Sequence, residues 1–209
     1  MQEHLNDLKE IRSLMEKSSK FISLSGLSGI FAGAVALLSA GVLYLKKVNA
    51  VGSYKLSGFY IDRSTDASYL EFLFLLAVAT LVLAIGGGLF LTWRKTRKSN
   101  QKLWNPLSRK LAVSLAIPLL VGGVFAIALV LNGMVRLVPA TTLVFYGLAL
   151  INTSQHTYRD VYSLGLCEVL LGLFALFVAG YSLLFWTIGF GVLHIVYGVS
   201  MYYKYDRKA

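Results

Sequence analysis

Six apolar stretches dominate the sequence, most of them long enough to cross a lipid bilayer. They lie at about residues 21–45, 69–93, 111–131, 138–156, 161–180 and 183–203. A transmembrane helix needs roughly 20 mostly apolar residues, because in hydrocarbon every backbone amide and carbonyl must find its hydrogen bond inside the protein. Charged residues make up only 14% of the chain and fall mainly between these stretches. The sequence therefore predicts an all-α fold, a polytopic membrane helical bundle with six transmembrane helices.

The fourth stretch is the shortest. Its apolar run from Val138 to Ile151 has only about 14 residues, against the roughly 20 that a crossing needs. We expect its helix to continue through Asn152 toward His156, where neighbouring helices can satisfy the polar side chains.

Lys and Arg are distributed unevenly over the connections. With six spans, both termini and the connections at 94–110 and 153–160 lie on one side, which carries 15 Lys and Arg residues against 5 on the other. The positive-inside rule then predicts the cytoplasmic (inner) membrane with both termini cytoplasmic. This topology accounts for the net charge of +10, so we expect no nucleic-acid partner.

The domain organisation follows from the same pattern. Residues 1–20 contain apolar residues at helical spacing among charges of both signs, which predicts a cytoplasmic amphipathic helix. Residues 21–203 form the six-helix transmembrane domain, and residues 204–209 form a cytoplasmic tail.

The last two apolar stretches carry the one acid and the one histidine that we place together inside the membrane. On each stretch, small residues and one ionisable residue recur in steps of three or four: Gly165, Glu168, Gly172, Ala175 and Ala179; then Thr187, Gly191, His194, Gly198 and Met201. An antiparallel hairpin turning between Tyr181 and Ser182 would pair these stripes, with Gly165 opposite Gly198 and Gly172 opposite Gly191.

Glu168 and His194 meet in the same register. Because a charged side chain at the centre of a membrane helix costs roughly 2.5 to 3.5 kcal/mol, we expect the two to be partners. One interpretation is a structural pair that fixes the hairpin, completed by Tyr197 or Ser28. Another is a protonatable site of Glu168, His194 and Tyr197 for a cation, a metal or a small solute. Glu168 and His194 are then the candidate metal ligands, while Cys167 points roughly 100° away on its helix.

A third interpretation is enzymatic. The fragment Gly26-Leu27-Ser28-Gly29, followed by a histidine on a late helix, is similar to the serine and histidine motifs of rhomboid intramembrane proteases. The resemblance implies a hydrolase with Ser28 as nucleophile, His194 as base and Glu168 as the orienting acid. Rhomboids carry that serine on a middle helix near the outer face, whereas Ser28 lies in the first stretch toward the cytoplasm. The sequence also lacks the HExxH and Walker A motifs.

Four fragments resemble an uncharacterised family of small bacterial six-helix integral membrane proteins. They are SSKFISLSGLSGIFAG, PATTLVFYGLALIN, LGLCEVLLG and GFGVLHIVYG. The resemblance extends from the first apolar stretch to the tail. It implies the six-helix topology and brings no known activity.

Together these observations predict a non-enzymatic membrane protein with a binding, sensing or transport-related role at the Glu168 and His194 site. The intramembrane hydrolase is the alternative, and an accessory protein that docks a protein partner at its cytoplasmic face is another. We expect the lipid bilayer and a small solute or cation as partners, and no cofactor. Homo-oligomerisation is left open.

Overall fold

The computed structural model describes residues 25–50, 67–98 and 104–207. Within these ranges the chain is 93% helical and forms no strand. The described residues include six helices long and apolar enough to cross a membrane, the number that the sequence predicts. The predicted amphipathic segment 1–20 and the last residues of the tail lie outside the described residues.

Each of the first five spans consists mainly of one α-helix. They are α2 (Gly26–Ala50), α3 (Ala67–Lys98), α4 (Pro106–Leu131), α5 (Val138–Thr153) and α6 (Asp160–Phe177). A 3₁₀ turn at each end lengthens α5: η1 (Val135–Leu137) precedes it and η2 (Ser154–His156) follows it. The fourth apolar run thus becomes a span of 22 residues that passes Asn152 and ends at His156.

The sixth span is composite. After the 3₁₀ turn η3 (Ala179–Tyr181), it consists of α7 (Ser182–Trp186), the π-helical segment η4 (Thr187–Leu193), α8 (His194–Met201) and a π-helical end η5 (Tyr202–Asp206). In a π-helix, backbone hydrogen bonds join residues five apart. The residues that follow therefore point to a different side than they would in an unbroken α-helix.

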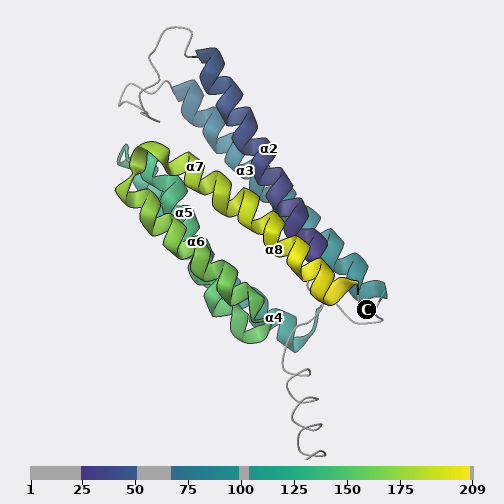
Figure 1. The fold of residues 1–209 in the computed structure, drawn as a ribbon. Helices are drawn as coiled ribbons and strands as arrows, with labels where there is room; N and C mark the ends of the chain where they lie inside the picture. The colour runs from purple at the N-terminus through teal and green to yellow at the C-terminus, as the bar shows by residue number, and fades with distance from the viewer. Residues whose placement is uncertain (1–24, 51–66, 99–103, 208–209) are drawn as a thin grey trace, which may run out of the picture.

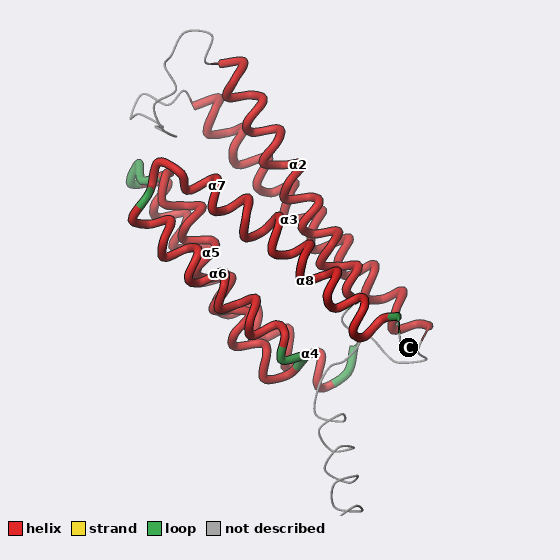
Figure 2. Tube along the Cα trace, viewed as in Figure 1, coloured by secondary structure: helices red, strands yellow, loops and turns green. Residues whose placement is uncertain are grey.

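The helices form two groups joined by the sixth span. In one group α2 packs on α3, and in the other α5 packs on both α4 and α6. The sixth span begins against α5 and α6 with α7 and ends against α2 with α8, so it crosses between the groups diagonally (Figure 1). The same path is clear in the Cα trace of Figure 2. Both groups therefore depend on the sixth span for their mutual contact.

Glycines provide the closest helix crossings. A Cβ on Gly147 of α5 would lie 2.6 Å from the carbonyl oxygen of Gly165 on α6, and a Cβ on Gly165 would lie 2.7 Å from that of Gly147. A Cβ on Gly198 would similarly lie 2.6 Å from the carbonyl oxygen of Gly26 on α2. Small residues let membrane helices approach this closely.

The predicted partners of these glycines are wrong. Gly165 faces Gly147 on α5 instead of Gly198, and Gly172 faces Ala140 on α5 instead of Gly191. The glycines of the sixth span face α2, where a Cβ on Gly33 would lie 2.7 Å from the Gly191 carbonyl oxygen. The physical reason is the diagonal course of the sixth span, which brings it onto the glycine-rich face of α2.

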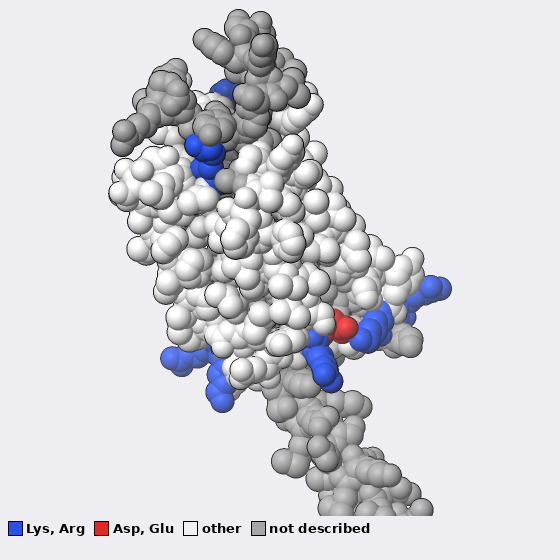
Figure 3. Space-filling view, turned by 60° about the vertical axis from the view of Figure 1, so that its left-hand side comes forward, with Lys and Arg blue, Asp and Glu red and all other residues white. Residues whose placement is uncertain are grey.

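The outer surface is apolar along the helices. In α3, none of the residues in the most apolar window is buried, although they include many large aliphatic and aromatic side chains. Figure 3 shows one face of the molecule, with Lys and Arg gathered toward the two ends and an uncharged band between them. A monomeric soluble protein rarely exposes so large an apolar patch, so this band fits the hydrocarbon of a bilayer.

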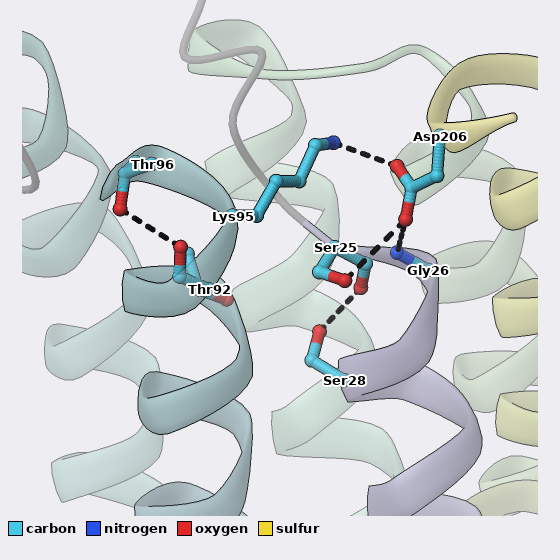
Figure 4. A network of polar contacts seen from close by, with 7 residues as sticks. All are labelled: Ser25, Gly26, Ser28, Thr92, Lys95, Thr96 and Asp206. Atoms are coloured by element: carbon cyan, nitrogen blue, oxygen red, sulfur yellow. Dashed lines mark hydrogen bonds and ion pairs between the residues drawn. The ribbon is translucent and has the colours of Figure 1, made fainter. Parts of the chain in front are cut away.

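Two aspartates join helices at one end of the molecule. This end, here called the basic end, is where α3 finishes, α4 begins and the sixth span ends. Asp206 accepts hydrogen bonds from the Gly26 backbone N–H at 2.9 Å and from Lys95 Nζ at 2.7 Å, which joins the sixth span to α2 and α3 (Figure 4). Asp160 at the start of α6 accepts from Lys204 Nζ at 2.9 Å and from the Tyr205 hydroxyl at 2.7 Å. The first helical N–H groups lack partners within their own helix, so the Asp206 carboxylate is a favourable cap for α2.

The crossing of α5 and α6 can be tested by adding one methyl group. We expect Gly147→Ala to destabilise the protein by about 1–3 kcal/mol, because the methyl would overlap the backbone of α6. Gly123→Ala on α4 is the matched control, since a Cβ there meets nothing within 4 Å. Thermal unfolding in detergent measures both. Equal midpoints for the two variants would contradict the described crossing.

The environment of Tyr158 at the basic end predicts that its phenol group ionises only at high pH. Burial, with smaller contributions from the negative charge of Asp206 and from Tyr205, raises the pKa of Tyr158 to about 12. The folded state then holds the phenol proton at pH values where the unfolded chain, with a pKa near 10, has lost it. This contribution to stability is complete below about pH 10 and is lost as the pH rises toward 12. The difference between the absorbance titration curves of the wild type and Tyr158→Phe should show one tyrosine ionising near pH 12. A midpoint near pH 10 would contradict the buried environment.

Candidate functional site

Glu168 and His194 lie together where the sixth span passes α6. The distance from His194 Nδ1 to Glu168 Oε1 is 3.3 Å, as the expected partnership requires. Glu168 points inward from the middle of α6, and His194 is the first residue of α8, directly after the π-helical segment. Their side chains are buried, with 0% and 5% of their surface exposed. The contact is therefore an acid–histidine pair enclosed by the protein.

The Glu168 carboxyl group has no hydrogen bond. Neither Oε1 nor Oε2 has such a partner among the described residues, although both are fully buried. The approach of His194 Nδ1 is short enough for an ion pair, but its hydrogen bond goes to the Gly189 carbonyl oxygen at 3.0 Å. Buried carboxylates without hydrogen bonds are costly, so this group differs from an ordinary structural salt bridge.

His194 has a partner at each ring nitrogen. The Gly189 carbonyl can only accept, so Nδ1 carries a hydrogen and donates to it. Nε2 lies 2.8 Å from the Tyr146 hydroxyl, which can donate to a neutral ring or accept from a protonated one. The ring also stacks on Phe190, with an interplanar angle of 19°. These contacts accommodate both the neutral imidazole and the imidazolium without rearrangement.

The π-helical segment makes room for the carboxyl group. A Cβ on Gly189 would collide with Glu168 Oε2 and would lie 2.5 Å from Leu143 Cδ2 on α5. Only glycine allows the backbone of the sixth span to come so near to Glu168. Short π-helical segments occur often at functional sites, and this one holds both the Gly189 carbonyl and the turn into His194.

The other predicted members of the site lie outside this contact. Tyr197 packs with Tyr158 against an apolar cluster of Leu150, Val161 and Leu164, and no hydrogen bond joins it to Glu168 or His194 within the described residues. The Cys167 thiol is exposed, on the neighbouring side of α6. Neither residue completes a ligand set with the pair.

Ser28 is not brought to His194. Its hydroxyl donates to the carbonyl of Ser25, the residue just before α2, at 2.5 Å, as Figure 4 shows. The neighbouring residue Gly29 is the one that faces the sixth span, 3.3 Å from the His194 carbonyl oxygen if a Cβ is added, whereas Ser28 is near Gly88 of α3. The described residues thus contain no nucleophile–base contact between Ser28 and His194.

The ligand chemistry of the site is limited. No group of three or more His, Cys, Asp or Glu side chains that could hold a metal occurs within the described residues. Stable transition-metal sites in proteins generally use at least three such ligands. Within the described residues, Glu168 and His194 thus provide two potential ligands at this position.

Sequence reasoning missed two members of the site, Tyr146 and Gly189. Tyr146 is the polar side chain in the middle of an otherwise apolar part of α5, which is the signal that could have singled it out. Gly189 contributes a backbone carbonyl through a π-helix, and side-chain patterns carry no information on that.

Comparison of the chain with protein-family models, with curated proteins and with solved structures found no match. The resemblance to an uncharacterised family of small bacterial membrane proteins therefore stays a prediction.

The close approach of Gly189 to Glu168 predicts energetic coupling between them. We expect Gly189→Ala to lower stability by about 1–3 kcal/mol, because the added methyl displaces the carboxyl group. In a Glu168→Ala background the same change should cost clearly less, since the methyl then meets only the flexible Leu143 side chain. Thermal unfolding of the wild type, the two single variants and the double variant gives the coupling energy. Gly41→Ala on α2 is the control, because a Cβ there meets nothing within 4 Å. Equal losses in both backgrounds would refute the contact.

Proposed function

We propose that this chain is a non-enzymatic, multi-pass protein of the cytoplasmic membrane whose Glu168–His194 site binds and releases a proton. In this proposal the site serves a binding, sensing or transport-related role. The observation that carries it is the Glu168 carboxyl group, fully buried and without a hydrogen bond, 3.3 Å from the ring nitrogen of His194.

Electrostatics favours one proton on the buried pair. A carboxylate beside a neutral imidazole would leave a net negative charge in apolar surroundings, at a cost of several kcal/mol. A protonated carboxyl beside neutral imidazole, or a carboxylate beside imidazolium, has no net charge. The hydrogen bonds of His194 to Gly189 and Tyr146 suit both forms. Proton loss therefore requires either water or a cation to reach the pair, which links protonation to opening of the site or to ligand entry.

A series of tyrosines extends from the pair toward the basic end, and we propose it as the path of proton exchange. Tyr197 lies one turn beyond His194, and it packs against the same apolar cluster as Tyr158. The Tyr158 ring in turn lies 4.1 Å from that of Tyr205, measured between centroids, and the Tyr205 hydroxyl donates to Asp160. The excess of Lys and Arg at this end supports a cytoplasmic orientation for it and for both termini. The pair would then exchange protons with the cytoplasm.

The hydrolase alternative has less support. His194 already has partners on both ring nitrogens, and the Ser28 hydroxyl is bonded within α2. A nucleophile and its base should lie within hydrogen-bond reach of each other.

Infrared spectroscopy tests the proton directly, because a protonated carboxyl and a carboxylate absorb at different frequencies. Spectra of the detergent-purified wild type between pH 5 and 8 should contain a pH-dependent carboxyl or carboxylate signal from a buried acid. Glu168→Gln should remove that signal, because the amide keeps the shape and cannot titrate.

Glu71→Gln is the matched control, since Glu71 is exposed on α3. It should leave the buried signal intact. If the pH-dependent spectra of the wild type and Glu168→Gln are the same, the protonation state of Glu168 does not change over this range and the pair is structural only.

A further inference from the structure

We propose that a groove at the basic end, between the start of α4 and the end of the fourth span, binds the phosphate group of an anionic phospholipid. The groove has a volume of about 670 Å³, and its walls include Trp104, Arg109, Lys110, Val113, Ser114 and His156. Sites for small molecules commonly have volumes of this size. A hydrogen bond from Asn152 Nδ2 to the Ser114 carbonyl, at 2.9 Å, joins the two walls.

The groove is positively charged, and no described residue compensates its charges. Arg109 and Lys110 lie on its wall, and among the described residues no acidic one does. The described carboxylates of the basic end are engaged elsewhere, Asp160 with Lys204 and Asp206 with Lys95. Within the described residues, the side chains of Arg109, Lys110 and His156 make no ion pair or hydrogen bond. They are therefore available to an external anion, and guanidinium and ammonium groups are the usual partners of phosphate.

The groove lies at the level of lipid headgroups. It is built from the first residues of the span Pro106–Leu131 and the last residue of the span Val135–His156. Trp104 stands at its rim with 71% of its surface exposed, as is typical of aromatic residues at a membrane interface.

An apolar track leads away from the groove along α4. Exposed side chains follow Arg109 on the same side of the helix at steps of three and four residues: Val113, Ile117, Leu120 and Val124. Among the described long helices, α5 makes the extensive contact with α4, and these four side chains are exposed, so this side faces outward. A phosphate between two cations with an apolar track beside it matches a phospholipid, whose acyl chains continue from its phosphate, better than a free phosphate ion.

Lipid-dependent stability tests the site. Thermal unfolding of the detergent-purified full chain would be recorded with phosphatidylglycerol, with phosphatidylcholine or with inorganic phosphate. We expect phosphatidylglycerol to raise the midpoint and the other two to have little effect. The double variant Arg109→Gln/Lys110→Gln should bind phosphatidylglycerol roughly 30-fold more weakly, because each cation near a lipid surface contributes on the order of 1 kcal/mol.

The matched control is Arg94→Gln/Arg97→Gln, which removes the same charge from the basic end of α3, outside the groove. It should keep the response to phosphatidylglycerol. Equal weakening by both double variants would reduce the effect to diffuse surface charge and overturn the proposal. Phosphate or phosphatidylcholine acting as well as phosphatidylglycerol would also overturn it.

A second measurement does not depend on variants that fold. Native mass spectrometry of the wild type, released from mixed micelles of the two phospholipids, should retain phosphatidylglycerol in preference to phosphatidylcholine. Equal retention contradicts the site.

Discussion

The close approach of helix backbones at glycine is the constraint on which this structure depends. Inside a membrane no hydrophobic effect drives helices together, so packing contacts decide which helices meet. Here Gly147 and Gly165 join α5 to α6, and Gly26 and Gly198 join α2 to the sixth span. The first contact holds α6 against α5, and the second holds the end of the sixth span against α2. Within the described residues, the sixth span makes the main contacts between the two groups, and the Glu168–His194 pair lies where it passes α6.

This position gives the pair its chemical character. A carboxyl group fixed within one helix group would be expected to gather hydrogen bonds from its neighbours, as buried polar groups generally do. Glu168 instead lies on α6 and His194 on the sixth span that joins the two groups, and the hydrogen bonds of His194 go to Gly189 and Tyr146. The carboxyl is left with a charge or a proton as its main compensation.

The hydropathy pattern was sufficient to predict the all-helical class and the six apolar helices, because the length of a span and the exclusion of charge from hydrocarbon are strong constraints. The helical spacing of Glu168 and His194 was sufficient to predict their partnership. The spacing of glycines predicted close packing but assigned it to the wrong helices, since periodicity defines a face and not the neighbour that covers it. Tyr146 lies on another helix, and the Gly189 carbonyl depends on a π-helix, so neither could follow from the pattern of the last two stretches.

The charged residues of the basic end are of two kinds: those that form ion pairs between helices and those that do not. Asp206 is held against the start of α2 and Lys95, and Asp160 against Lys204, so these ions tie the sixth span to both groups. The α4 helix lies at the edge, where no described carboxylate reaches Arg109 or Lys110. Ion pairs between elements that must stay together use the described aspartates of this end, whereas Arg109 and Lys110 lie next to an exposed apolar side of α4. In the proposed lipid site, these two cations lie where anionic headgroups can reach them.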